Sequence, residues 1–293
     1  MNREIVKFCS KKGMIIIEKT VTYLYPDAKN ASNLKMYQDR TNQIKALYFT
    51  KESIKEIEKL PSSNSYAVYF LFNNSEIDEK RVYIGQSMNG VRRISEHVKN
   101  KEFWTYCIMF VSDNNSFDKL TIDYLEYKFI KKFKKSSYVL INKDLRNQEP
   151  NVSIYDKPKL TVFIEQIEFL LNAEGITISE FIADNDELAY YYPSKKYKAK
   201  LFVKDGKFIL EKESELKRPL ESSKTWKNDR HYKRFNKLID DYIEDEKVIE
   251  ENGKIIVLIN LVFNAPSTPA NLITGYSENG WLFFKGLNEL RNN

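Results

Sequence analysis

Two neighbouring runs of sequence decide the fold of this chain: Tyr66-Ala67-Val68-Tyr69-Phe70-Leu71-Phe72 and, after a polar loop, Arg81-Val82-Tyr83-Ile84-Gly85-Gln86. Both runs are rich in β-branched and aromatic residues, and the loop between them is rich in Asn, Ser and Asp. This pattern predicts an antiparallel pair of strands. Beyond it, Val91, Ile94 and Val98 recur at helical spacing and predict a helix over 90–100. Arg93 and His97 would then lie one turn apart on the same helical face.

The segments that follow continue the alternation of strands and helices. An apolar run at 104–111 has the length of a strand, and a turn rich in Asn and Ser comes after it. Residues 120–133 predict a helix in which Glu126 lies beside an apolar stripe. A short strand at 138–142 and a second long helix at 160–172 complete this part, and Gly175 marks its end.

The two flanking regions have patterns of their own. Residues 1–60 contain apolar clusters that predict two or three strands and a short helix at 51–60, with a boundary at Pro61. We interpret this part as a structural or docking segment. In the C-terminal part, Asp205-Gly206 between two apolar runs predicts a tight hairpin. A helix over 229–245 and a strand over 255–263 follow.

Composition limits the class of protein. A chain of 293 residues with 42% hydrophobic and 30% charged residues is long enough for about two folded domains and is typical of a globular protein. The longest apolar run, 255–263, is far shorter than the ~20 residues that cross a bilayer. Two cysteines, Cys9 and Cys107, cannot form a disulfide framework. We therefore predict a cytoplasmic protein without membrane segments.

The predicted fold class is α+β, in three parts: an N-terminal structural segment (1–60), a small module with an antiparallel sheet flanked by helices (61–175), and a basic α+β domain (176–293). Residues 193–237 hold fifteen Lys and Arg against six Asp and Glu, although the whole chain has a net charge of only +6. Such asymmetry favours a polyanionic partner, and a solvated lysine-rich surface explains the charge alone equally well. The aromatic residues interleaved with these cations suit either stacking on nucleic acid or an ordinary core; they are Tyr197, Phe202, Trp226, His231 and Tyr232.

Five elements in order resemble the signature of the GIY-YIG nuclease superfamily over residues 61–172. They are Ala67-Val68-Tyr69, Tyr83-Ile84-Gly85, Arg93, Leu125-Glu126-Tyr127 and Asn142. Each is commonplace by itself, because a tyrosine in a strand usually packs and a lone Arg, Glu or His on a helix is usually solvated. Their joint order and spacing carry the resemblance. One departure is Ala67, where the family usually has glycine.

The resemblance implies a role for each site residue. Tyr69 and Tyr83 would present hydroxyl groups to the attacking water, with Tyr69 as general base and His97 as its proton acceptor. Arg93 would bind the scissile phosphate, because a guanidinium offers forked donors to phosphate oxygens. Glu126 would be the single carboxylate that holds Mg²⁺, with Mn²⁺ as a substitute. Asn142 matches the late asparagine of the family, and Asn147 competes for that assignment.

The implied activity is Mg²⁺-dependent hydrolysis of phosphodiester bonds in DNA by an endonuclease, in a setting such as restriction or phage defence. One site per chain would need a homodimer or two sequential events for double-strand cutting. The alternative is a catalytically inactive nucleic-acid-binding or interaction protein that keeps the fold. Residues 266–281 also resemble an uncharacterised domain that is often fused behind bacterial GIY-YIG modules.

Overall fold

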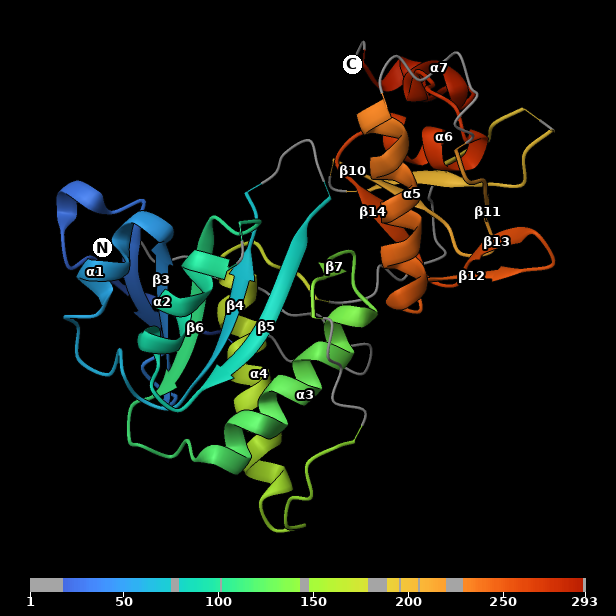
Figure 1. Cartoon of the computed structure of the whole chain (residues 1–293). Helices are drawn as coiled ribbons and strands as arrows, with labels where there is room; N and C mark the ends of the chain where they lie inside the picture. The colour runs from blue at the N-terminus through green and yellow to red at the C-terminus, as the bar shows by residue number, and fades with distance from the viewer. Residues whose placement is uncertain are drawn as a thin grey trace. The chain divides into compact units, whose positions relative to one another are not determined.

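The computed structural model describes residues 18–74, 79–100, 102–142, 148–178, 189–194, 196–204, 206–219 and 229–291, with the side chains of 96–100 and 229–230 left out (Figure 1). The chain forms two compact units. The first comprises Met1–Asn74, Arg81–Lys131 and Ile141–Thr177, and the second comprises Ser75–Lys80, Lys132–Leu140 and Ile178–Asn293. The fold class is α+β, as the sequence predicts.

The first unit is built on one antiparallel sheet with the strand order β1-β2-β3-β6-β4-β5. Its strands are β1 (Thr22–Leu24), β2 (Leu34–Gln38), β3 (Ile44–Thr50), β4 (Ala67–Phe72), β5 (Arg81–Ser87) and β6 (Tyr106–Ser112). The predicted hairpin is confirmed as β4 and β5. Strand β4 lies between β5 and β6 and is buried along its whole length. A strand covered on both faces needs apolar side chains at every position, which is why its sequence does not alternate.

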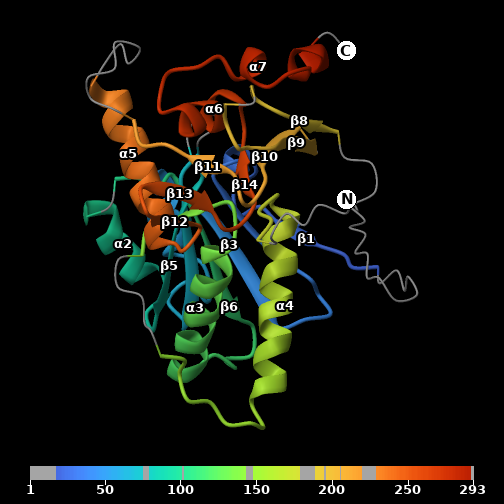
Figure 2. The same cartoon turned by 90° about the vertical axis from the view of Figure 1, so that its right-hand side faces the viewer.

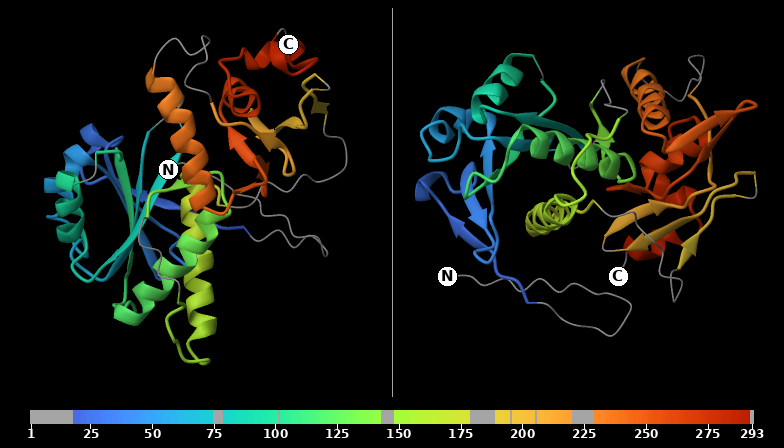
Figure 3. Two further views of the ribbon diagram at one scale, coloured as in Figure 1. Left: turned by 45° about the vertical axis from the view of Figure 1, so that its right-hand side comes forward. Right: turned by 90° about the horizontal axis from the view of Figure 1, so that it is seen from below.

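Helices cover both faces of this sheet. They are α1 (Ile54–Ile57), α2 (Val91–Asn100), α3 (Lys119–Lys134) and α4 (Lys157–Ala173), with short 3-10 turns at Ala28–Asn30 and Lys51–Ser53. Figure 2 shows α3 and α4 side by side on one face, and Figure 3 shows α2 on the opposite face. Side chains of β4 alternate between the two layers: Tyr69 joins the cluster with Ile94 of α2, and Phe70 packs edge-on against Phe129 of α3, 5.2 Å between ring centroids. The alternation fixes which helix each strand residue can reach.

The N-terminal residues are part of this sheet, so the structure divides the chain differently from the three predicted parts. Strand β3 pairs with β6 from Ile44 opposite Ser112 to Thr50 opposite Tyr106. The boundary at Pro61 is a surface turn between two strands of one unit. A turn of Pro, Ser and Asn looks the same in sequence whether it joins strands or domains, which is why the pattern did not distinguish them. The predicted apolar clusters within residues 1–17 lie outside the described residues.

The second unit contains two small sheets. One has the order β14-β10-β9-β8 and the other β11-β13-β12. The strands of these two sheets are β8 (Tyr190–Tyr191), β9 (Leu201–Lys204), β10 (Lys207–Leu210), β11 (Glu215–Leu216), β12 (Val248–Glu251), β13 (Lys254–Val257) and β14 (Leu261–Phe263). A further short strand, β7 (Val139–Leu140), is the seventh strand of the first sheet, next to β5. The helices are α5 (Asp229–Glu244), α6 (Ser267–Thr274) and α7 (Gly280–Phe283), followed by a 3-10 helix at Leu287–Arg291.

The predicted hairpin around Gly206 is confirmed, since β9 and β10 pair from Lys204 opposite Lys207. The single strand predicted over 255–263 is wrong. It is two strands, β13 and β14, which belong to different sheets. The break falls at the exposed Leu258 and at Asn260, whose side-chain oxygen accepts a hydrogen bond from the Lys212 backbone at 2.9 Å. Apolar content alone could not reveal this break.

None of the helices in the described part of the chain is long and apolar enough to cross a membrane.

Candidate active site

Tyr69 is the central residue of the candidate site. It lies in the middle of β4, its side chain is 1% exposed, and it faces Gly85 of β5 across the hairpin. A Cβ atom added at Gly85 would lie 2.4 Å from both Cζ and Oη of the Tyr69 ring. The phenol therefore lies directly over Gly85, and a residue with any side chain there would displace it. This contact explains why the tripeptide Tyr83-Ile84-Gly85 ends in a residue without a side chain.

Ala67, the one departure from the family pattern, is compatible with the same strand. It is a fully buried residue of β4 and pairs with Ser87 on one side and Val111 on the other. Its backbone is ordinary extended strand, which an alanine adopts without strain. The departure leaves the position of Tyr69, two residues further on, unaffected.

Tyr83 supplies a second phenol on the same face of the sheet. It pairs with Leu71 in the register of β4 and β5, and Leu71 shares a face with Tyr69. The ring centroids of Tyr69 and Tyr83 are 6.3 Å apart, with the ring planes tilted by 36°. Tyr83 is only half-buried, whereas Tyr69 is enclosed. The pair thus runs from the interior toward solvent.

Arg93 comes from α2, whose start is fixed by Gly90. This glycine has φ of +49°, and an added Cβ would meet the Ser63 carbonyl oxygen at 1.9 Å. The same carbonyl accepts a hydrogen bond from Val91 N at 2.8 Å. Ile94 is fully buried in the cluster that contains Tyr69, which leaves Arg93 on the exposed side of the helix. His97, the predicted proton acceptor of Tyr69, is part of α2, but its side chain is outside the described part of the structure.

Glu126 comes from α3, on the other side of the sheet from α2. Leu125 and Tyr127 on either side of it are buried, and Glu126 itself is half-buried. The edge contact between Phe70 and Phe129 holds this part of α3 against β4. A carboxylate in such surroundings has little water around it, so its charge acts strongly on nearby groups.

Tyr83, Arg93 and Glu126 all affect the pKa of Tyr69. Burial raises its pKa well above the usual value, and Tyr83, Cys107 and the Glu126 carboxylate raise it further, while the Arg93 guanidinium lowers it. The charges of Arg93 and Glu126 thus act on the same phenol, although they come from helices on different faces of the sheet. A phenol with such a raised pKa keeps its proton near neutral pH, so the predicted role of Tyr69 as a general base requires positive charge to be brought close to it.

The side chain of Asn142 is hydrogen-bonded to the backbone of β5. Its side-chain oxygen accepts a hydrogen bond from Ile84 N at 2.9 Å, and its amide nitrogen donates to Ile84 O at 2.7 Å. Both polar atoms of the side chain are therefore used by the backbone of β5 between Tyr83 and Gly85. Asn142 is a positioning residue for that strand. The competing assignment, Asn147, lies outside the described residues.

The donors available to a metal ion are few. Within the described residues, no group of three or more His, Cys, Asp or Glu side chains could hold a metal ion. Glu126 offers one hard carboxylate oxygen donor. That set suits Mg²⁺, which keeps most of its water ligands and is often held by one or two carboxylates with substrate phosphates.

The expected aromatic partners of the C-terminal basic segment fall into two groups. Phe202 is fully buried and is a core residue of its sheet, whereas Tyr197 is half-buried and His231 is exposed on α5. Tyr232 is half-buried, and Trp226 lies outside the described residues. Some of the basic side chains are paired with acids from outside the segment 193–237, as in Arg218–Glu250 and Arg218–Asp240, both at 2.8 Å. The local surplus of positive charge is therefore smaller at the surface than the sequence indicates.

Two features of the site were missed by the sequence reasoning. Neither the contact of Tyr69 with Gly85 nor the influence of Cys107 on Tyr69 was expected. Both depend on strand register: Gly85 faces Tyr69 across one edge of β4, and Cys107 faces Leu71 across the other. The pairing of two strands depends on the turn that joins them, and the sequence does not determine that turn here. A shift of the pairing by one residue would move every side chain to the other face of the sheet, so neither contact could be predicted.

The fold defines the protein as an α+β protein whose first unit is an antiparallel sheet with helices on both faces. Residues 190–289 of the second unit match the family model of DUF4357, a domain of unknown function. The expected uncharacterised C-terminal domain is thus found, and it extends from the first residue of β8 into the last 3-10 helix. Comparison with curated proteins and with solved structures gave no match.

Proposed function

We propose that this protein is a Mg²⁺-dependent endonuclease of the GIY-YIG type that hydrolyses phosphodiester bonds in DNA. The observation that carries the proposal is the electrostatic environment of Tyr69, on which Tyr83, Arg93 and Glu126 all act. These side chains come from two strands and two helices. The two phenol rings are 6.3 Å apart, and a guanidinium and a carboxylate act electrostatically on one of them. These are the groups that phosphodiester hydrolysis requires.

The roles follow from charge and exposure. Arg93 is exposed on α2 and stays charged at every physiological pH, so it binds the phosphate that is to be cleaved. Tyr83, which is half-buried, orients the attacking water. Tyr69 is enclosed and keeps its proton in the free protein. It therefore acts first as a hydrogen-bond donor to the water or phosphate, and it becomes a base only when positive charge is brought close to it.

Glu126 is the residue that would hold Mg²⁺. When bound there, the ion supplies Lewis-acid stabilisation of charge on the phosphate and the leaving oxygen. The carboxylate of Glu126 now raises the pKa of Tyr69, and neutralising this carboxylate removes that effect. The arrangement couples the charge at Glu126 to the proton of Tyr69. Such coupling between neighbouring groups with shifted pKa values is typical of catalytic sites.

A plasmid assay tests the proposal. Purified protein is incubated with supercoiled plasmid with Mg²⁺ or with a chelator, and nicked and linear products are resolved on a gel. We expect cleavage only with Mg²⁺. Glu126→Gln, which keeps the shape of the side chain and removes its charge, should lower the rate by on the order of 10²–10³-fold, because a catalytic metal is worth several kcal/mol.

Glu165→Gln is the matched control, since Glu165 is an exposed acid on α4 of the same unit. It should cleave at the wild-type rate. An unchanged rate in Glu126→Gln, or cleavage that persists in the chelator, would remove the metal assignment. Binding of DNA without any cleavage would favour the alternative of an inactive nucleic-acid-binding protein that keeps the fold.

A further inference from the structure

A hollow with a volume of about 430 Å³ belongs to the second unit, whereas the candidate active-site residues belong to the first. Its walls come from the edge of the sheet β11-β13-β12 and from the end of α6. Ile255 and Leu216 form its buried floor, and Tyr276 and Lys217 are on its rim. The volume falls in the range of sites that bind small organic molecules. It lies wholly within the segment that matches the domain of unknown function.

The basic side chains of this hollow differ in what they contact. Arg218 is already bound by two acids: it donates to Glu250 at 2.8 Å and to Asp240 at 2.8 Å. Its charge is therefore neutralised and it forms a fixed wall. The ammonium groups of Lys196 and Lys217 instead each lie 5.3 Å from the ring centroid of Tyr197. Within the described residues, their contacts are with this ring and with no carboxylate.

This difference makes the two lysines available to an anion. A cation over an exposed aromatic ring gains only about 0.5–1 kcal/mol. A charge-assisted hydrogen bond to a phosphate oxygen is stronger. Both side chains are exposed, so each ammonium group can reach a phosphate oxygen of a strand bound in the hollow. Tyr197 is itself held in place by Phe283, with ring centroids 5.4 Å apart.

An aromatic ring stands at the rim next to these cations. Tyr276 is 38% exposed, and its backbone nitrogen donates to Thr274 Oγ1 at 3.0 Å. Gly275 before it has φ of +74°, and an added Cβ would lie 3.0 Å from the Arg218 carbonyl. The backbone of Lys217 also donates to Leu272 O at 2.8 Å, which fixes β11 against α6. The backbones that carry Tyr276 and Lys217 are therefore both fixed where these residues line the hollow.

We propose that this hollow binds one unpaired nucleotide of a DNA strand. Lys196 and Lys217 contact the phosphates of the strand on either side of that nucleotide, and its base stacks on Tyr276. Stacking on an aromatic side chain combined with a backbone contact to cations is the usual chemistry of single-strand binding. A base inside a duplex is covered on both faces and could not use the ring. The proposal rests on the proposed function only in taking DNA as the partner.

Fluorescence anisotropy of labelled DNA tests this inference. Full-length protein is titrated, in chelator so that no cleavage occurs, into a blunt duplex and into the same duplex with a single-stranded overhang. We expect tighter binding to the overhang. Tyr276→Ala should weaken that binding on the order of tenfold, because stacking is worth about 1–3 kcal/mol per base, and should leave the blunt duplex unchanged.

Charge reversal is tested with a matched pair of variants. K196E/K217E changes the hollow, and K212E/K285E makes the same change of net charge at exposed lysines that do not line it. We expect the first pair to abolish the preference for the overhang and the second to preserve it. Equal losses in both pairs would show a general charge effect and overturn the proposal. So would a wild-type protein without preference for the overhang.

A competitor separates DNA from an acidic peptide as the occupant. An unlabelled single-stranded oligonucleotide should displace the labelled overhang, and poly-glutamate of the same charge should not. Displacement by both at equal concentration would overturn the assignment to a nucleotide. Because no metal is present, failure of plasmid cleavage has no effect on this result, so the two proposals fail separately.

Discussion

At the scale of single residues, the contact between Tyr69 and Gly85 is the most constrained feature of the site. The tyrosine ring occupies the space that a side chain at position 85 would fill. Gly85 lies in an ordinary strand, so its backbone would accept an alanine without strain. Any penalty for a side chain there must therefore come from the collision with the ring and from nothing else.

This reasoning gives a prediction for Gly85→Ala. We expect a loss of about 1–3 kcal/mol in the free energy of unfolding, since overpacking of a core has that magnitude. Urea denaturation measures it. The same substitution in a Tyr69→Ala background should have a much smaller effect, because the colliding atoms are gone. Equal effects in both backgrounds would contradict the contact.

The residue scale also shows the limit of what the sequence could predict. Three of the predicted site residues, Tyr83, Arg93 and Glu126, shift the pKa of a fourth, Tyr69, and the sequence was sufficient to single out all four. The task of Asn142 could not be predicted, because a side-chain amide that pairs with the Ile84 backbone has the same sequence as one that contacts substrate. The proton on Tyr69 also depends on burial, which only the packed sheet determines.

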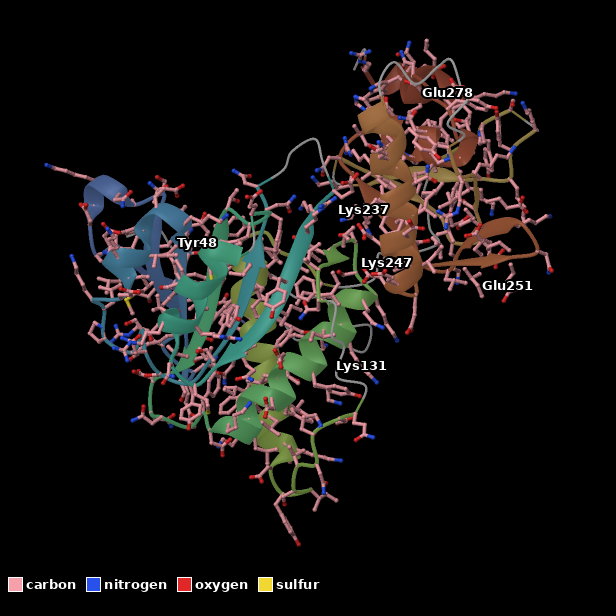
Figure 4. All side chains as sticks on the ribbon, in the orientation of Figure 1. Tyr48, Lys131, Lys237, Lys247, Glu251 and Glu278 are labelled. Atoms are coloured by element: carbon pink, nitrogen blue, oxygen red, sulfur yellow. The ribbon has the colours of Figure 1, made fainter. Side chains whose placement is uncertain are left out.

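At the scale of elements, the second unit contains a buried ion pair near the end of α5. Lys247, which is labelled in Figure 4, is fully buried. Its Nζ is 3.1 Å from Asp245 Oδ2 and also donates to the Tyr138 carbonyl. The same carboxylate oxygen of Asp245 accepts a hydrogen bond from Leu140 N at 3.0 Å. Burial lowers the pKa of Lys247 and raises that of Asp245. The pair therefore fastens β7 to the turn between α5 and β12.

Breaking this pair on one side should be costly. We expect Lys247→Met to lower the free energy of unfolding by about 3–5 kcal/mol, because it leaves the buried Asp245 charge without its partner. K247M/D245N should recover part of the loss, since the asparagine oxygen can still accept from Leu140. Lys237→Met, an exposed position on α5, is the control. Thermal or urea denaturation that finds the single and double variants equally stable would refute this role.

Elements with clear periodicity were predicted well, and those set by tertiary pairing were not. The helices over 90–100, 120–133 and 229–245 appear as α2, α3 and α5 with ends shifted by one residue or less. The continuous run at 255–263 instead divides between two sheets. Local spacing encodes a helix, whereas the partner of a strand is chosen by segments far away in the chain.

At the scale of the whole molecule, buried tyrosines in both units should govern stability in alkali. Burial raises the pKa of Tyr37, Tyr69, Tyr138 and Tyr242. In the unfolded chain they ionise near pH ~10, and the folded chain resists that ionisation. Their contribution is therefore fully present below pH ~10 and is lost as the pH rises toward the folded values, by up to ~1.4 kcal/mol per pH unit for each tyrosine.

Urea denaturation at about pH 8 and pH 11 measures this slope. Tyr37→Phe is the informative variant, because the Tyr37 hydroxyl is buried without a hydrogen-bond partner in the described structure. We expect its stability near pH 8 to equal or exceed that of the wild type, and its loss in alkali to be smaller. A wild-type protein that gains stability between these pH values would contradict the account. Lys247, whose pKa is lowered, acts in the opposite direction but is a single group.

The central claim is that the side chains around Tyr69 act as one catalytic site. A double-mutant cycle on the rate of plasmid nicking in Mg²⁺, with Tyr69→Phe, Arg93→Lys and the two combined, tests this claim most directly. We expect each single variant to lose on the order of 10²-fold and the double variant to lose far less than the product of the two, because residues that act as a unit are not additive. Nicking that is unaffected by either change, or losses that simply multiply, would contradict it.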